Sequence, residues 1–236
     1  MSNDNAAQCL VITGGSKGIG LATARRFLEA GHRVVNLSRS PLPLAGATHI
    51  EVDLADPGWT EQVAAPLLRA VAGAASLALV HNSALQVPGS VDAIEAEDLR
   101  RMLEINVVAP TRLNRLLLAQ MRPGSSILYI GSTLSLRATP GMAAYATCKH
   151  ALLGLMRSTC QDLAGRGIHT ALICPGFTDT EMLREFAGPA LAQVRARCTQ
   201  GRLIEPREIA EVIHFAAGNA VVNGATLGAD LGLIEL

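Results

Sequence analysis

Two side chains that could exchange a proton stand four positions apart, Tyr145 and Lys149, in the stretch AAYATCKHALLGL. The apolar pattern of this stretch predicts a helix, and side chains at i and i+4 of a helix share one face. A free tyrosine titrates near pH ~10, and an adjacent cation favours the phenolate. The pair therefore suits proton transfer near neutral pH. A partly buried tyrosine beside a solvated lysine is the alternative interpretation.

A serine is placed to join this pair. Ser132 follows an apolar run in YIGSTLS, where the carboxyl end of a strand is expected. Ligands of open α/β sheets bind at those strand ends. We therefore expect Ser132 and Tyr145 to serve one site.

The segment LVITGGSKGIG, residues 10–20, fits two motifs. Residues 14–18 match G-x-S-x-G, which would make Ser16 the nucleophile of a hydrolase. Residues 13–20 match T-G-x-x-x-G-x-G, a glycine-rich turn that brings a helix N-terminus to the phosphates of a dinucleotide. The second interpretation is favoured, because little chain precedes the motif to form an oxyanion hole and no convincing Asp-then-His pair follows it.

Short apolar runs alternate with long amphipathic stretches along the chain. The runs predict strands at residues 9–13, 33–38, 49–53, 77–82, 126–131, 169–174 and 225–230, and the stretches predict helices at 19–30, 59–72, 97–121, 143–164 and 206–217. This alternation indicates βαβ units and a parallel sheet covered on both faces. We predict an α/β fold with one doubly wound Rossmann domain and a seven-stranded parallel sheet over residues 9–236, after a poorly ordered tail of residues 1–8.

Charge and cysteine content exclude several partners. Twenty Lys and Arg balance twenty Asp and Glu, which leaves no basic field for nucleic acid or an anionic membrane. The longest apolar run, residues 70–80, is too short to span a bilayer, and MSNDNAAQ lacks the pattern of a secretory signal. The five cysteines show no C-x-x-C spacing and the six histidines no i, i+4 pair. We expect free thiols, no metal site and a cytoplasmic location.

Several segments, taken in order with the glycine turn, resemble the short-chain dehydrogenase/reductase family over nearly the whole chain. LEINVVAP carries Asn106 in the family's helix motif, Ser132 precedes Tyr145 by thirteen positions, and Lys149 completes Y-x-x-x-K. PGFTDTEM, residues 175–182, is similar to the loop that closes on the nicotinamide. NGATLGADLG, residues 223–232, is similar to the terminal strand segment.

The resemblance implies a mechanism and four catalytic residues. Tyr145 would donate a proton to a carbonyl oxygen during reduction or remove it during oxidation. Lys149 would lower the pKa of Tyr145 and hold the nicotinamide ribose. Ser132 would hydrogen-bond the carbonyl oxygen, and Asn106 would hold a water that connects Lys149 to solvent. Asn106 could also be a structural residue at a helix kink, where its side chain hydrogen-bonds backbone groups; this role is compatible with the first.

The cofactor contacts follow from the turn, the strand ends and the resemblance. The second expected strand ends in NLSRS, with Ser38 where an acidic residue would repel a phosphate and Arg39 next to it. Arginine suits phosphate, and Lys17 adds a second cation, so we expect NADP(H). Asp53 should cap the adenine side through a side-chain hydrogen bond. The expected cofactor-binding residues are Gly14, Ser16, Lys17, Gly18, Ile19, Gly20, Ser38, Arg39, Asp53, Leu54, Asn82, Ser83, Ala84, Tyr145, Lys149, Pro175, Gly176, Thr178 and Thr180.

Two segments depart from the family pattern. The usual N-N-A-G after the fourth strand is His81-Asn82-Ser83-Ala84, and a left-handed backbone at Ala84 would be strained. His81 is expected to be a core residue. The terminal D-G-G is Asp230-Leu231-Gly232.

The favoured activity is reduction of an apolar ketone or 3-oxoacyl substrate to an alcohol. Residues 177–203 form an expected lid, in which Phe177, Met182 and Phe186 contact substrate and Leu183 and Leu191 add apolar surface, while Leu134 and Leu136 form the opposite wall. A helix that simply packs on the sheet is the alternative interpretation of this segment. The sequence shows no anchor for a strongly charged substrate. A non-catalytic NADP-sensing or interaction protein on the same fold is the alternative, and the resemblance implies a homodimer or homotetramer.

Overall fold

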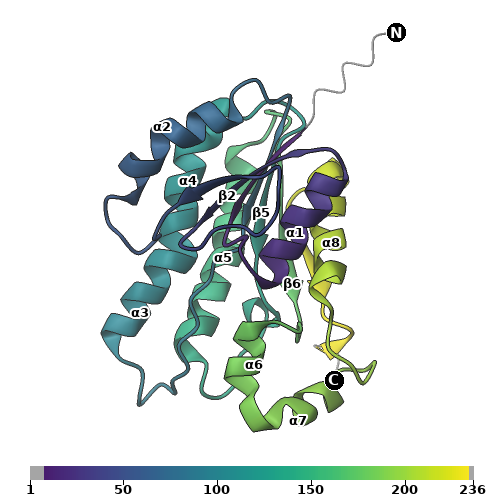
Figure 1. Ribbon diagram of the computed structural model, residues 1–236. Helices are drawn as coiled ribbons and strands as arrows, with labels where there is room; N and C mark the ends of the chain where they lie inside the picture. The colour runs from purple at the N-terminus through teal and green to yellow at the C-terminus, as the bar shows by residue number, and fades with distance from the viewer. Residues whose placement is uncertain (1–7, 234–236) are drawn as a thin grey trace.

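The computed structural model describes residues 8–233 as a seven-stranded, entirely parallel sheet with helices on both faces (Figure 1). The sheet order is β3-β2-β1-β4-β5-β6-β7. The strands are β1 (Cys9–Thr13), β2 (Arg33–Ser38), β3 (Thr48–Glu51), β4 (Leu77–His81), β5 (Ser126–Ile130), β6 (His169–Pro175) and β7 (Ala225–Ala229). The predicted α/β fold with seven parallel strands is confirmed. Of the predicted tail, residues 1–7 lie outside the described residues.

Eight α-helices are described: α1 (Gly18–Glu29), α2 (Trp59–Val71), α3 (Ala96–Leu103), α4 (Ala109–Leu117), α5 (Ala143–Asp162), α6 (Glu181–Ala187), α7 (Leu191–Ala196) and α8 (Pro206–Gly218). No helix within residues 8–233 is long and apolar enough to cross a membrane. All five cysteines are free thiols.

One face of the sheet is covered by α2, α4 and α5, and the other by α1 and α8 (Figure 1). Trp59 and Leu113 are fully buried on the first face, and Phe27 and Ile213 on the second. The strands read as continuous apolar runs because both faces are buried. Each fully buried side chain of this size contributes roughly 1.5–3 kcal/mol.

The fourth strand carries a polar network into the first face. His81 lies 3% exposed at the end of β4, where its ring stacks on Tyr129 with centroids 4.9 Å apart. Its Nε2 donates to Asn114 Oδ1 at 2.8 Å, and the Tyr129 hydroxyl bonds Asn114 and Thr159. Burial lowers the pKa of His81 to about 4, so the ring is neutral. His81 is thus a core residue, as expected.

The helix predicted over residues 97–121 is not one α-helix. A π-helical turn, η1 (Glu104–Val108), separates α3 from α4, and a 3₁₀ turn, η2 (Leu118–Gln120), follows α4. π-turns occur mostly inside longer helices and often at functional sites. A π-turn holds one residue more than an α-helical turn. The apolar periodicity of the sequence continues through η1, so it did not reveal this insertion.

The backbone strain expected at Ala84 occurs elsewhere. Ala84 does not have a positive φ; Leu231 does, with φ 52°, and it is the one such non-glycine residue in the described chain. Leu231 stands in the altered D-G-G segment, where a glycine would adopt this conformation without cost. The side chain of Leu231 packs against the α1–α8 core, which offsets the strain.

The start of α1 approaches β1 more closely than a side chain would permit. A Cβ at Gly20 would lie 2.1 Å from the carbonyl oxygen of Gly14 and 2.6 Å from the side-chain amide of Asn82. Both neighbours are held in place, the first by the backbone and the second by its own hydrogen bonds. Gly20 therefore sets the position of the α1 N-terminus over the end of the sheet.

We predict that Gly20→Ala lowers the free energy of unfolding by about 3 kcal/mol or more, because this overpacking is against backbone. Urea unfolding measures the change. Gly154→Ala in α5 is the matched control: nothing lies within 4 Å of its Cβ position, and a helical alanine should add about 0.5–1 kcal/mol. Equal stability of the two variants would contradict the close approach.

Candidate active site

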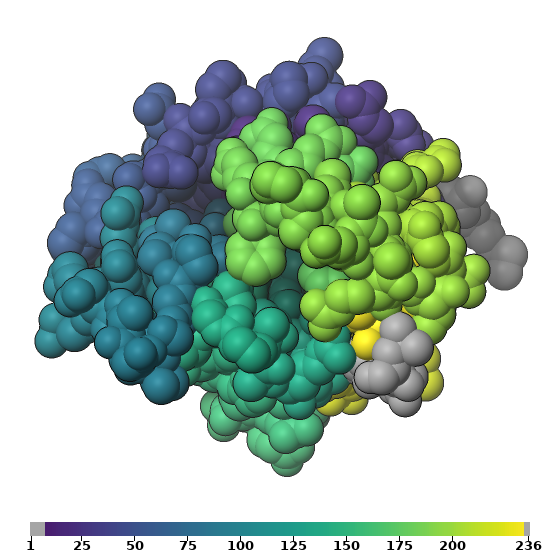
Figure 2. Space-filling view, turned by 90° about the horizontal axis from the view of Figure 1, so that it is seen from below, coloured from purple at the N-terminus to yellow at the C-terminus, as the bar shows by residue number. Residues whose placement is uncertain are grey.

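The carboxyl ends of the strands open into a cavity of about 720 Å³, which the lid segment with α6 and α7 borders (Figure 2). All predicted site residues line this cavity except Gly20 and Asn106. Six cationic side chains line it against two carboxylates, Asp53 and Glu181; the cations are Lys17, Arg39, Arg101, Arg137, Lys149 and Arg197. In a chain whose charges balance overall, this arrangement focuses positive potential in the cavity.

The glycine turn forms one end of the cavity. Gly14 and Gly18 have φ values of 69° and 53°, and the N–H of Gly15 donates to Asn36 Oδ1 at 2.8 Å. Lys17, the N-cap of α1, makes no side-chain cap hydrogen bond. The turn therefore leaves N–H groups at the start of α1 uncapped by a side chain, as an anion-binding helix N-terminus requires.

Asn82 ties the end of β4 to this turn. Its side-chain nitrogen donates to the carbonyl oxygens of Thr13 and Gly14, at 3.1 and 2.9 Å. The Thr13 hydroxyl in turn accepts from the N–H groups of Asn82 and Ser83, each at 3.0 Å. These four bonds hold β1 and β4 together where the sheet order reverses, which is where doubly wound folds bind ligands.

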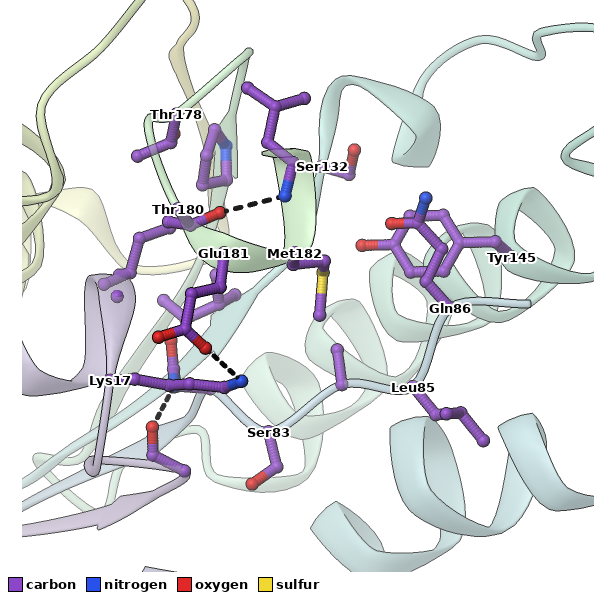
Figure 3. A pocket seen from close by; sticks show the side chains of 18 of the residues that line it. Lys17, Ser83, Leu85, Gln86, Ser132, Tyr145, Thr178, Thr180, Glu181 and Met182 are labelled. Carbon is purple, nitrogen blue, oxygen red and sulfur yellow. Dashed lines mark hydrogen bonds and ion pairs between the residues drawn. The ribbon is translucent and has the colours of Figure 1, made fainter. Parts of the chain in front are cut away.

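Lys17 does not present a free charge to the cavity. Its Nζ lies 2.5 Å from Glu181 Oε2, in an ion pair that joins the glycine turn to the first residue of α6 (Figure 3). The side chains of the two residues are 62% and 60% exposed. The second cation expected from the sequence is therefore shared with the lid.

The end of β2 and the loop after β3 also line the cavity. Ser38 is buried and its hydroxyl donates to the carbonyl oxygen of Ser40 at 2.7 Å. Arg39 is exposed, lines the cavity and forms no ion pair within residues 8–233. One carboxylate oxygen of Asp53 accepts from the N–H of Ala55 at 2.9 Å, which orients the side chain.

Tyr145 and Lys149 lie on one face of α5, with the Lys149 Nζ 5.4 Å from the centre of the Tyr145 ring. The ammonium donates to the carbonyl oxygen of Ile130 at 2.7 Å. Burial lowers the pKa of Lys149 to about 8. Burial raises the pKa of Tyr145 and the nearby Cys148 raises it further, so the lowering expected from the neighbouring lysine does not occur.

Ser132 follows β5 and starts the 3₁₀ turn η3 (Thr133–Ser135). Its hydroxyl oxygen accepts from the N–H of Leu134 at 3.1 Å, and its own N–H donates to Ser135 Oγ at 3.2 Å. This reciprocal cap fixes the Ser132 side chain at the cavity wall. The hydroxyl proton remains available for a ligand oxygen.

Asn106 lies in the π-turn and is 1% exposed. Its side chain exchanges two hydrogen bonds with the backbone of Leu85, at 2.8 and 2.9 Å. It therefore holds the segment after β4 against the kinked helix, and Leu85 itself lines the cavity. Asn106 does not line the cavity itself, but it holds Leu85, which does.

Apolar side chains line part of the cavity. Phe177, Met182, Leu183 and Phe186 line it from the lid, and Leu134 lines the opposite wall. Met182 lies between Glu181 and Tyr145 in the close view (Figure 3). The expectation was wrong for Leu136, which is 42% exposed beyond η3 and does not line the cavity. Leu191 begins α7 in the segment expected as a lid and does not line the cavity.

Sequence reasoning missed four polar residues that shape this site. Asn36 is fully buried and positions the glycine turn; a polar residue inside the apolar run RVVNLS was its one signal. Arg101, Arg137 and Arg197 line the cavity from three distant segments. The sequence showed no anchor for a strongly charged substrate because it does not show that these three arginines line one cavity.

The hydrolase interpretation of Ser16 fails on geometry. None of the six histidines of the described chain lines the cavity, so Ser16 has no imidazole base there. No group of three or more His, Cys, Asp or Glu within the described chain could hold a metal ion. Ser16 is a wall residue of the glycine turn.

The fold and cavity define a protein of the doubly wound, dinucleotide-binding class. Residues 14–234 match the family model described as Enoyl-(Acyl carrier protein) reductase. The chain is 33% identical to 2-(R)-hydroxypropyl-CoM dehydrogenase of Xanthobacter autotrophicus, over 93% of this chain and 96% of that protein. It is 28% identical to the 3-oxoacyl-(acyl-carrier-protein) reductase FabG of Escherichia coli, over 94% and 96%.

A solved structure agrees with these sequence matches. A blue fluorescent protein from a metagenomic library, in complex with NADPH, superposes with a TM-score of 0.86 at 31% identity, covering 98% of this chain and 99% of that one. The chain belongs to the short-chain dehydrogenase/reductase family and resembles its 3-oxoacyl reductases. The family acts on small molecules with nicotinamide cofactors.

The buried lysine gives a stability prediction. Between pH 8 and pH 10.5 the unfolded chain binds a proton at Lys149 that the folded chain does not, so this residue makes the protein more stable as pH rises through that window. Relative to Lys149→Met, the wild type should gain up to about 3 kcal/mol between pH 7 and pH 10.5. Urea unfolding of both proteins at each pH measures the difference. A difference that does not change with pH would contradict the burial of a titrating ammonium.

Proposed function

We propose that this protein is an NADP(H)-dependent oxidoreductase that reduces a carbonyl group to an alcohol. The observation that carries the proposal is that Ser132, Tyr145 and Lys149 line the same cavity as the glycine turn, whose helix N-terminus has no side-chain cap. A non-catalytic NADP-sensing protein would need the turn but not the Ser132-Tyr145-Lys149 set. We infer that catalysis is the function of the set.

The residues present fit a dinucleotide. Gly14 and Gly18 line the cavity and have positive φ, and a Cβ at either would crowd Ser83 Oγ at 2.8 Å or Thr180 at 3.1 Å. A backbone without side chains at these points permits close approach of a pyrophosphate. From the family resemblance, Asp53 and Leu54 would border the adenine and Thr178 and Thr180 the nicotinamide, and all four residues line the cavity.

Arg39 is the basis for preferring NADP(H) over NAD(H). It follows the buried Ser38 in the chain, lines the cavity and forms no ion pair with a carboxylate of the described residues. A planar cation at this strand end matches a ribose 2′-phosphate, and an acidic residue that would bind a free 2′-hydroxyl is absent from NLSRS. The NADPH named with the superposed structure supports the same choice.

The bound nicotinamide would supply a hydride to the carbonyl carbon. Ser132 would donate a hydrogen bond to the carbonyl oxygen, and Tyr145 would donate its proton to the same oxygen. Burial keeps Tyr145 protonated at neutral pH, which is the form that reduction needs. Lys149, held by the Ile130 carbonyl, would bind the nicotinamide ribose and place a cation near the phenol as the proton leaves.

The substrate would be apolar next to its carbonyl, because Phe177, Met182, Phe186 and Leu134 line that end of the cavity. A ketone or a 3-oxoacyl compound meets this condition, and the 3-oxoacyl reductase named among the relatives supports the second. We infer assembly as a homodimer or homotetramer, from the family resemblance, and action in the cytoplasm.

We predict that Tyr145→Phe lowers kcat for NADPH-dependent ketone reduction by about 10²–10⁴-fold, because it deletes the proton donor. NADP+ binding, measured by thermal shift, should stay within about twofold. Tyr129→Phe is the control: it removes a hydroxyl that bonds Asn114 and Thr159 in the core, so it should lower stability and keep turnover. Unchanged turnover in Tyr145→Phe would contradict the mechanism.

We predict that Arg39→Ala weakens NADP+ binding by about 10- to 100-fold, the loss of a charged hydrogen bond, and leaves NAD+ binding unchanged. Thermal-shift titration with each cofactor measures both affinities. Arg25→Ala on α1 is the control, because that exposed arginine does not line the cavity. An unchanged ratio of NADP+ to NAD+ affinity would refute the assignment, and no shift with either cofactor would refute the proposed function.

A further inference from the structure

Two arginines at the substrate end of the cavity have no role in the proposed mechanism. Arg137 lies five residues after Ser132, just beyond η3, and is half-buried. Arg197 directly follows α7 in the lid and is exposed. Both line the cavity together with Tyr145.

The guanidinium of Arg137 makes fewer hydrogen bonds than it has donors. Its Nη1 donates to the carbonyl oxygen of Leu233 at 3.3 Å, while its Nε is buried and has no hydrogen-bond partner in the described chain. Within residues 8–233 neither Arg137 nor Arg197 forms an ion pair with a carboxylate. A buried donor without a partner costs about 1–3 kcal/mol, so a native structure that keeps one on a cavity wall has a use for it.

The segments that carry the two arginines both hydrogen-bond the C-terminal turn, residues 230–233. Arg137 bonds the carbonyl oxygen of Leu233, and Thr199, two residues after Arg197, donates to the carbonyl oxygen of Leu231. The guanidinium of Arg197 lies 5.7 Å from the centre of the Phe177 ring, a cation–π contact that limits its orientations. Asp230 in the same turn accepts from the N–H of Gly232 and does not line the cavity.

We propose that Arg137 and Arg197 bind an anionic group, a carboxylate or a sulfonate, on the substrate at the end remote from its carbonyl. This inference rests on the proposed carbonyl reduction and names the substrate class. The guanidinium fork matches the paired oxygens of such groups and gives orientation as well as affinity. An apolar segment between carbonyl and anion would lie against Phe177, Met182 and Phe186, and the anion at the arginines would fix the carbonyl at Ser132 and Tyr145.

Matched probes test the charge requirement in the wild-type enzyme. Straight-chain methyl ketones of four to seven carbons that end in a carboxylate are compared with their methyl esters, and 5-oxohexane-1-sulfonate with a neutral ketone of equal length. We expect kcat/KM with NADPH to be at least tenfold higher for the best acid than for its ester. In thermal-shift titration of the NADP+-saturated enzyme, the same acid should bind at least tenfold more tightly than its ester.

Variants assign the effect to the two arginines. Arg137→Gln and Arg197→Gln should each lower kcat/KM for the acid by about 10- to 100-fold, mainly through KM, and change the ester by less than about twofold. Arg195→Gln is the matched control, because this exposed arginine lies two residues away in α7 and does not line the cavity. It should leave both probes unchanged. Arg197 is exposed, so its variant keeps the test valid if Arg137→Gln folds poorly.

The outcomes separate this inference from the proposed function. Reduction of neutral ketones with no preference for acids, or equal losses for acid and ester in Arg197→Gln, would overturn the anion site and leave carbonyl reduction standing. Failure of NADP+ to bind, with no ketone of either charge reduced, would overturn the proposed function. Tighter binding of the acid than of the ester, lost in Arg197→Gln, would support the anion site even for a probe that is not reduced.

Discussion

The hydrogen bonds between Asn82 and the end of β1 are the constraint on which the cavity depends. The chain leaves β1 toward β2 on one side and returns to β4 on the other, so a crevice opens between the connections of these neighbouring strands. Asn82 closes the floor of the crevice by bonding the carbonyl oxygens of Thr13 and Gly14, groups that the departing backbone would otherwise leave unpaired. With the floor fixed, α1 starts at one place, and the Asn106 amide holds the segment that follows.

Burying Lys149 and Tyr145 beside the cavity costs free energy, because each has a charged form that loses its solvation. Lys149 is 2% exposed, and an ammonium so buried is tolerated because the carbonyl oxygen of Ile130 accepts its hydrogen bond. The same burial acts on Tyr145 in the opposite direction, since it disfavours the anionic phenolate as it disfavours the cationic ammonium. The two groups are thus tuned by one low-dielectric environment more than by each other, which differs from the simple picture of a cation activating an adjacent phenol.

Most of the sheet could be predicted from the sequence, because strands buried on both faces must be apolar throughout, as CLVIT and LALVH are. The glycine turn was also visible, since close backbone approach permits no other residue at Gly20. Features set by tertiary contacts were not. The π-turn around Asn106 keeps the apolar period of its helix, and the positive φ falls on Leu231 and not on Ala84, because the C-terminal turn determines it. The sequence likewise carries no sign that arginines from separate segments face one cavity.

The ion pair between Lys17 and Glu181 has a consequence for how the cavity opens. Both side chains are more than half exposed, and an exposed pair of this kind contributes about 0–1 kcal/mol. The contact between α6 and the glycine turn therefore contributes little free energy, and thermal motion can break and re-form it. Because salt screens exposed charges, added salt should weaken this contact between two segments that lie far apart in the sequence.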